Sequence, residues 1–411
     1  MQKILEATRT GDWLTVQRLR AYSLILLALA LAAIAAIAVQ SHDLLMPNDN
    51  PVGADFAEVW VAGQEALQGH PAAPFDMQTH IAAQHAVFGP KAAVYGWHYP
   101  PYFLIPAQAL ARLPYVPALV LWQALTFAFY LFVIATIARR APGDMRLWML
   151  AAVAFPAVLV NVGHGQNGFL TAGLMAAGLM ALDRRPWLAG ALLALLAYKP
   201  NFAIVLPVAL LLHFRWRAIV SGALVGALAT LATFALFGVE AWRAFFANLD
   251  VTRTIVIEQG AAGFEKIQSV FAGVRLLGGS IGAAYGVQSV ATLATLGALA
   301  WVWRSSADMR VKIAAALIAT QLTTPYCLDY DMMTLGPALA LLASHGLERG
   351  FQPYEKSGLA LGFMTPLIAR PFAIAFGVPF GAPATILLFV VALRTAIAAR
   401  ESRPTLVFAR T

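Results

Sequence analysis

The sequence predicts an all-α protein that crosses a membrane many times, and two observations carry this prediction. Hydrophobic residues make up 60% of the 411 residues, charged residues only 12%, and the mean hydropathy is +0.71. A soluble domain needs more charge to cover its water-facing surface. Apolar runs close to the length that crosses a bilayer recur along the chain. We expect a bundle of about 11–13 membrane segments, with further helices in its outer loops.

The distribution of positive charge predicts how this bundle is oriented. The net charge is +8, and most Lys and Arg fall in loops that alternating segments place on one side, such as Arg139 and Arg140. Cytoplasmic loops carry such an excess. We therefore assign the charge to membrane topology rather than to nucleic acid, and expect a multi-pass protein of a bacterial cytoplasmic (inner) membrane. The single cysteine, Cys327, excludes an intramolecular disulfide and a cysteine metal cluster.

The first quarter of the chain predicts a lead, one span and a large outer loop. Residues 1–20 suit a short, basic amphipathic segment on the cytoplasmic surface, followed by an integral domain over 21–399. The apolar run Tyr22–Val39 exceeds a normal signal-peptide core, which favours an uncleaved anchor over a cleaved signal. The outer loop, 40–99, should hold short helices over 55–67 and 76–88, separated by Gly69-His70-Pro71.

The remaining segments alternate with turns. Pro101–Leu113 is too short to cross and suits an interfacial or re-entrant helix. Basic residues at both ends of 187–214 favour a hairpin hinged at Lys199-Pro200, whereas one long span would reverse every later orientation. A second outer loop is expected over 238–282 and a cytoplasmic tail over 400–411. The other expected segments are 116–138, 147–162, 168–182, 218–237, 284–302, 311–322, 332–343, 359–368 and 384–399.

Polar sequence at membrane depth marks candidate functional sites, because it is tolerated only where it lines a cavity or is buried in protein. Four such clusters open to the outer side in this assignment: Asp55 with Glu58, Trp97-His98-Tyr99-Pro100-Pro101, Gly163-His164-Gly165-Gln166-Asn167-Gly168, and the stretch from Thr324 through Tyr326 and Asp329 to Asp331. Lys199 is a fifth candidate, the cation that lies deep in an apolar run. Such a cation usually has a partner.

Each candidate also has a purely structural interpretation. Asp55 either caps the helix that follows it or acts as a catalytic base. His164 either completes a turn or contacts substrate, and Lys199 either pairs or snorkels to the membrane surface. Asp329 and Asp331 are either functional or ordinary outer-surface charges. Because no His-x-x-x-His or Glu-x-x-His spacing is present, we expect no metal and no cofactor.

The order of these pieces resembles glycosyltransferase family 87. That family of polytopic GT-C enzymes includes the polyprenol-phosphate-mannose-dependent α-mannosyltransferases of phosphatidylinositol mannoside synthesis. The resemblance runs from about Gly53 to Gly336 and implies a GT-C fold, a lipid-phosphate sugar donor and a catalytic acid in the first outer loop, which is Asp55. The matching pieces are Asp55 in Asp-Phe-x-x-x-Trp, His98-Tyr99-Pro100-Pro101, Gly165-Gln166-Asn167, Lys199-Pro200, Lys266-Ile267-Gln268-Ser269-Val270-Phe271, Arg275-Leu276-Leu277-Gly278 and Thr324-Pro325-Tyr326.

We therefore expect an inverting transferase that moves a sugar, with mannose the sugar that the family suggests, from a polyprenyl-phosphate donor to a glycolipid or glycan acceptor on the periplasmic side. Asp55 would accept the proton of the attacking hydroxyl. Lys199, Lys266 or Arg275 would stabilise the departing phosphate. The remaining candidates for substrate contact are Glu58, His98, Tyr99, His164, Gln166, Asn167, Gln268, Tyr326 and Asp329. A transporter or flippase of lipid-linked sugar is the alternative, although the chain shows no two similar halves.

Overall fold

The computed structural model describes residues 2–401, and this part of the chain is helical throughout, with no β-strand. It contains eighteen α-helices joined by short 3₁₀ and π-helical turns. Six helices are long and apolar enough to cross a bilayer, and a bent pair makes a possible seventh. The prediction of an all-α, multi-pass membrane protein is confirmed. Residues 402–411 of the expected tail lie outside the described residues.

The long helices account for about half of the expected segments. They are α2 (Val16–Gln40), α6 (Tyr115–Ala138), α12 (Trp216–Val251), α14 (Ile281–Arg304), α17 (Glu355–Phe376) and α18 (Gly381–Glu401). The other expected segments are shorter helices inside the bundle, among them α9 (Gly168–Ala181), α15 (Met309–Leu322) and α16 (Leu335–Arg349). Every residue of α15 from Val311 to Leu322 is buried, so these shorter helices form the core that the long ones surround.

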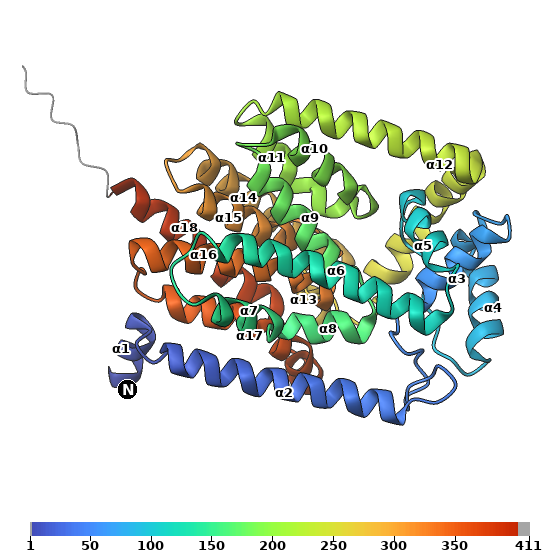
Figure 1. Ribbon diagram of the computed structural model, residues 1–411, viewed down its shortest axis with the longest axis horizontal. Helices are drawn as coiled ribbons and strands as arrows, with labels where there is room; N and C mark the ends of the chain where they lie inside the picture. Colours follow the sequence, from blue (N-terminus) through green and yellow to red (C-terminus); the bar gives the residue numbers. More distant parts are fainter. Residues whose placement is uncertain (1, 402–411) are drawn as a thin grey trace, which may run out of the picture.

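The N-terminal lead is shorter than expected. It consists of α1 (Gln2–Thr10), and α2 already starts at Val16 because the Thr15 side chain accepts a hydrogen bond from the Arg18 backbone N–H and caps it. No helix breaker lies between Val16 and Tyr22, so the helix includes residues assigned to the lead. In Figure 1, α1 lies at one end of the molecule and α2 runs towards the other.

The first outer loop folds as expected into α3 (Phe56–Leu67) and α4 (Met77–Phe88). Asp76 caps α4 by accepting from the Thr79 N–H at 2.8 Å. The short α5 (Leu104–Leu110) packs on α3, where a Cβ on Gly63 would lie only 2.2 Å from the Ala107 carbonyl oxygen. Figure 1 shows α3, α4 and α5 gathered at the end opposite α1.

The expected span over 147–162 is broken. It forms α7 (Met145–Val153) and α8 (Pro156–His164), bent by 45°. Pro156 has no N–H to continue the first helix but fits the first turn of the second. Gly165 ends α8 with φ 59°, a left-handed conformation that glycine adopts without strain.

The segment 187–214 is a hairpin, as expected. It comprises α10 (Pro186–Ala194), 3₁₀ turns over 195–198 and 200–205, and α11 (Leu206–Leu211), with Lys199 at the break. The Arg215 guanidinium pairs with Asp183, so the two ends of the segment meet. One long span would separate these residues, and the hairpin interpretation is therefore confirmed.

The second outer loop is more helical than expected. After a kink at Gly238 (φ 71°), α12 continues to Val251 and then as a π-helix over Thr252–Glu258. Glycine can adopt this positive φ, so the chain turns without ending its helical run. A connecting stretch over 259–269 leads to α13 (Val270–Leu276), which precedes α14.

Ion pairs gather the basic loops at the end that holds α1. Arg20 lies 3.7 Å from Asp144, and Arg310 lies 2.5 Å from Glu348. The Tyr354 N–H donates to the Arg9 carbonyl at 2.7 Å, which ties α1 to the start of α17. Each of these contacts joins two segments that were expected on the cytoplasmic side.

Candidate active site

Asp55 lies at the start of α3 but does not cap it. Its side chain makes no capping hydrogen bond and is 8% exposed, so the capping interpretation is wrong. Ala54, just before it, has φ 37°, which is strained for a residue with a Cβ. The chain therefore turns sharply here, and the carboxylate points into the protein instead of along the helix axis.

Three side chains from distant segments surround this carboxylate. The Lys266 ammonium lies 3.4 Å from both oxygens, from the stretch that follows the π-helix. The His164 Nδ1 lies 3.3 Å from Oδ1, and the Gln166 amide donates to Oδ2 at 3.2 Å. Asp55 is therefore held by one cation, one imidazole and one amide.

The pKa values of Asp55 and Glu58 shift in opposite directions. Burial alone would raise the pKa of Asp55, but Lys266, His164 and Gln166 outweigh burial and lower it below its ordinary range. Burial, followed by the charge of Asp55, raises the pKa of Glu58. Within residues 2–401, no hydrogen bond or ion pair engages the Glu58 carboxyl group, although only 5% of the residue is exposed. Two neighbouring carboxyl groups with opposite shifts are typical of acid–base sites.

Tyr99, Gln166 and Asn167 join the same site. The Tyr99 hydroxyl donates to the Gln166 Oε1 at 3.0 Å and accepts from the Asn167 amide at 2.8 Å. Asn161 holds the turn by donating to the Gln166 carbonyl at 3.0 Å. The Asn167 Oδ1 is buried with no hydrogen-bond partner among the described residues, which leaves an acceptor open.

The two candidate lysines differ in how firmly they are paired. Lys199 lies 2.5 Å from Asp331, and both side chains are at most 5% exposed, so the snorkelling interpretation is wrong. Lys266 makes a looser ion pair, with both Asp55 oxygens at 3.4 Å. The Tyr330 ring lies 5.0 Å from the Lys199 ammonium and 5.7 Å from that of Lys266. The Tyr330 ring is thus within cation–π distance of both ammonium groups.

Asp329 and Asp331 are not surface charges, since they are only 3% and 1% exposed. Asp329 lies 3.9 Å from the His164 Nε2 and accepts from Arg370 at 3.3 Å. Arg370 is not among the residues predicted from the sequence. It falls just beyond the expected span 359–368, and the continuation of α17 to Phe376 places it inside a helix.

The other predicted residues lie outside the Asp55 cluster. The His98 Nδ1 bonds the Thr252 hydroxyl at 2.9 Å, and burial lowers the pKa of His98 to about 4. Arg275 donates to the carbonyls of Gly279 and Glu258 at 2.8 and 3.2 Å. The Tyr326 carbonyl accepts from Asn201 at 2.8 Å. Roles for these residues in substrate binding stay predictions.

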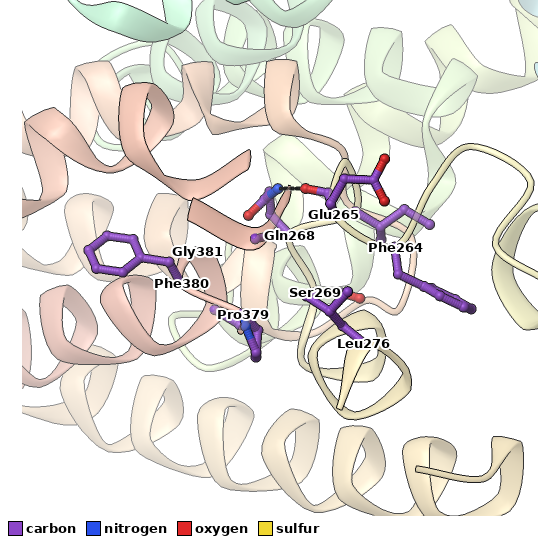
Figure 2. A pocket seen from close by; sticks show the side chains of 11 residues that line it. Phe264, Glu265, Gln268, Ser269, Leu276, Pro379, Phe380 and Gly381 are labelled. Carbon is purple, nitrogen blue, oxygen red and sulfur yellow. Dashed lines mark hydrogen bonds between the residues drawn. The ribbon is translucent and has the colours of Figure 1, made fainter. Parts of the chain in front are cut away.

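Gln268 lines a separate, small cavity next to the start of α18 (Figure 2). Its amide donates to the Glu265 carbonyl at 2.8 Å, and its neighbours there include Pro379 and Gly381. The cavity measures about 10 Å³, which holds one water molecule but no sugar. A contact between Gln268 and substrate also stays a prediction.

Comparison with known protein families matches residues 97–327 to Glycosyltransferase family 87, which is more than half of the chain. The chain belongs to glycosyltransferase family 87. The match covers Tyr99, the turn at 164–167, Lys199 and Lys266, whereas Asp55 precedes it and Asp329 follows it. No curated protein and no solved structure matched. Family 87 membership implies a transferase that uses a sugar donor and an acceptor, and the helices make it a multi-pass membrane enzyme.

Proposed function

We propose that this family 87 enzyme transfers a sugar from a polyprenyl-phosphate donor to a glycolipid or glycan acceptor, with Asp55 as general base. The proposed sugar is mannose, which the family suggests. The observation that carries the proposal is the Asp55 carboxylate itself. It is buried, it has no capping role, and its cationic and polar neighbours lower its pKa. It is therefore ionised at neutral pH and able to accept a proton.

In the proposed step, the acceptor oxygen forms a bond to the anomeric carbon while the bond from that carbon to the phosphate oxygen breaks. The acceptor proton passes to Asp55, and the electron pair of the broken bond leaves with the polyprenyl phosphate. Attack from the face opposite the phosphate inverts the anomeric centre.

Lys266 is the proposed partner of the departing phosphate. It lies beside the base, and its 3.4 Å contacts leave it free to turn towards an incoming anion. Lys199 is held at 2.5 Å by Asp331, and Arg275 donates to two backbone carbonyls, so both cations are already engaged. A positioned cation at a developing phosphate charge stabilises the transition state.

The groups proposed for the sugar are Glu58 and the polar network that reaches Asp55 through Gln166. The free Asn167 Oδ1 can accept from a sugar hydroxyl, and the Glu58 carboxyl lies one helical turn from the base. Tyr99 supplies a phenol and an aromatic ring in the same network. Planar polar groups and aromatic faces suit a pyranose.

We also propose that the α3–α5 end faces the periplasm of a bacterial cytoplasmic membrane. The basic loops lie at the other end, which favours a cytoplasmic location for that end. Nucleotide sugars are absent from the periplasm, which supports a lipid-phosphate donor.

The test is transfer in proteoliposomes with radiolabelled polyprenyl-phosphate mannose and octyl α-mannoside as acceptor. The expected result is equimolar release of polyprenyl phosphate and labelled disaccharide, with the product anomer inverted relative to the donor. Movement of intact donor between leaflets without release of polyprenyl phosphate would indicate a flippase and would overturn the proposal.

A further inference from the structure

A histidine lies between two buried carboxylates at the proposed site. The His164 Nδ1 is 3.3 Å from the Asp55 Oδ1, and its Nε2 is 3.9 Å from the Asp329 Oδ1. The second Asp329 oxygen lies 3.3 Å from the Arg370 guanidinium. Four segments distant in the sequence thus contribute to one chain of charged groups that ends at the proposed base.

Packing limits the freedom of each member. At Gly165, next to His164, a Cβ would come within 2.6 Å of the Phe56 side chain, so the turn packs directly against the start of α3. Asp329 accepts from the Tyr330 N–H at 2.9 Å, and its own N–H donates to the Lys266 carbonyl at 3.0 Å. The imidazole ring lies 5.7 Å from the Tyr330 ring. Both ring nitrogens are therefore directed at carboxylates.

We propose that His164 is a positioning residue for Asp55 and that Asp329 and Arg370 orient it in turn. The inference rests on the proposed role of Asp55 as base. It differs from the sequence prediction, in which His164 and Asp329 contact substrate.

The chemical reason is that a base must present one oxygen to the acceptor hydroxyl in a fixed direction. The Nδ1 of His164 is within hydrogen-bond distance of Asp55, whereas Nε2, at 3.9 Å from Asp329, is within ion-pair distance only. A protonated imidazole in this position places positive charge beside Asp55. Its charge and its hydrogen bond both lower the pKa of Asp55. His164 thus keeps the base ionised as well as oriented.

The test is the pH profile of kcat/KM for His164→Gln, which keeps an amide donor but removes the charge. Since the Asp55 carboxylate loses a stabilising cation, the acid limb should move to higher pH. We expect kcat to fall about tenfold to a hundredfold through misplacement of the base, with the KM for donor unchanged. Asp329→Asn should shift the limb in the same direction. Arg370→Lys should retain more activity than Arg370→Met.

Other titrating groups surround the chain and must be separated from it. The titratable neighbours are Lys266, Glu58, Lys199, Asp331 and His98, and the neighbouring phenols are those of Tyr95, Tyr99, Tyr326 and Tyr330. Burial raises the pKa of each phenol, so none titrates on the acid side. Glu58, Asp331 and His98 titrate in wild type and variant alike, so the difference between the two profiles reports on His164.

The matched control is His345→Gln, because His345 lies 3.7 Å from Asp308 at the opposite end of the molecule and should leave the profile unmoved. Thermal unfolding in detergent verifies that each variant is folded, and Asp329→Asn provides the test if His164→Gln is not. An unmoved acid limb in a folded variant, or a raised KM alone, would overturn the inference while the proposed function stands. Absence of transfer by the wild-type enzyme would overturn both.

Discussion

The most direct perturbation of the proposed mechanism is Asp55→Asn, which keeps the shape of the side chain and removes its charge and basicity. A positioned general base contributes about 10²- to 10⁴-fold to a rate. We therefore expect kcat to fall by about this factor, equivalent to roughly 3–5 kcal/mol in the activation free energy.

The same change also affects stability, and the structure indicates by how much. The Asp55 and Lys266 side chains are 8% and 10% exposed, so the pair is buried. Removing one partner of a buried pair costs about 3–5 kcal/mol of unfolding free energy, because the other charge is left uncompensated. The double variant Asp55→Asn/Lys266→Met removes both charges, so it should regain stability without regaining activity.

The assay measures polyprenyl phosphate released from radiolabelled donor in proteoliposomes, with the melting temperature in detergent measured in parallel. Asp250→Asn is the matched control, since Asp250 is in the second outer loop and its side chain is 83% exposed. Turnover of Asp55→Asn within a few-fold of wild type, by a folded protein, would refute the role of Asp55 as base.

Three further predictions concern the neighbouring charges. Lys266→Met should raise the KM for donor about tenfold to a hundredfold through loss of a charge-assisted contact. It should also move the acid limb of kcat/KM to higher pH, because Lys266 lowers the pKa of Asp55. Lys199→Met should lower the unfolding free energy by about 3–5 kcal/mol, and Lys199→Met/Asp331→Leu should recover most of it, as measured by thermal unfolding. Glu58→Gln should be more stable than wild type at alkaline pH. Burial raises the pKa of Glu58 in the folded state above its ordinary value in the unfolded state. The wild type therefore loses stability as the pH rises from the unfolded-state pKa to the folded-state pKa.

Each of these predictions has its own control or opposing result. Lys312 is buried at the opposite end and donates to the Trp303 carbonyl at 2.9 Å, so Lys312→Met should leave the KM for donor unchanged. An unchanged KM in Lys266→Met would assign the phosphate to another cation. Equal stability of Lys199→Met and wild type would mean that the pair with Asp331 contributes nothing. A melting temperature of Glu58→Gln that follows the wild type at every pH would contradict the raised pKa.

Properties that depend on neighbouring residues could be predicted from the sequence. The apolar runs and their flanking charges indicated a multi-pass helical protein. The prolines and polar residues marked the breaks, so that α3 and α4 were predicted within one residue of their observed starts. The charges at both ends of 187–214 indicated the hairpin. The ordered motifs indicated the family that the comparison identified.

Which polar side chains meet was decided by the tertiary structure. Asp55 and Lys266 are 211 residues apart, and Lys199 and Asp331 are 132 apart. Three other residues matched the family motifs equally well but lie outside the Asp55 cluster, because their hydrogen bonds go to other groups. They are His98, Gln268 and Arg275. The reason is physical: an apolar membrane helix looks alike on its lipid-facing and protein-facing sides. Its sequence therefore specifies that it crosses or packs, but the direction of each buried charge depends on which helices come together.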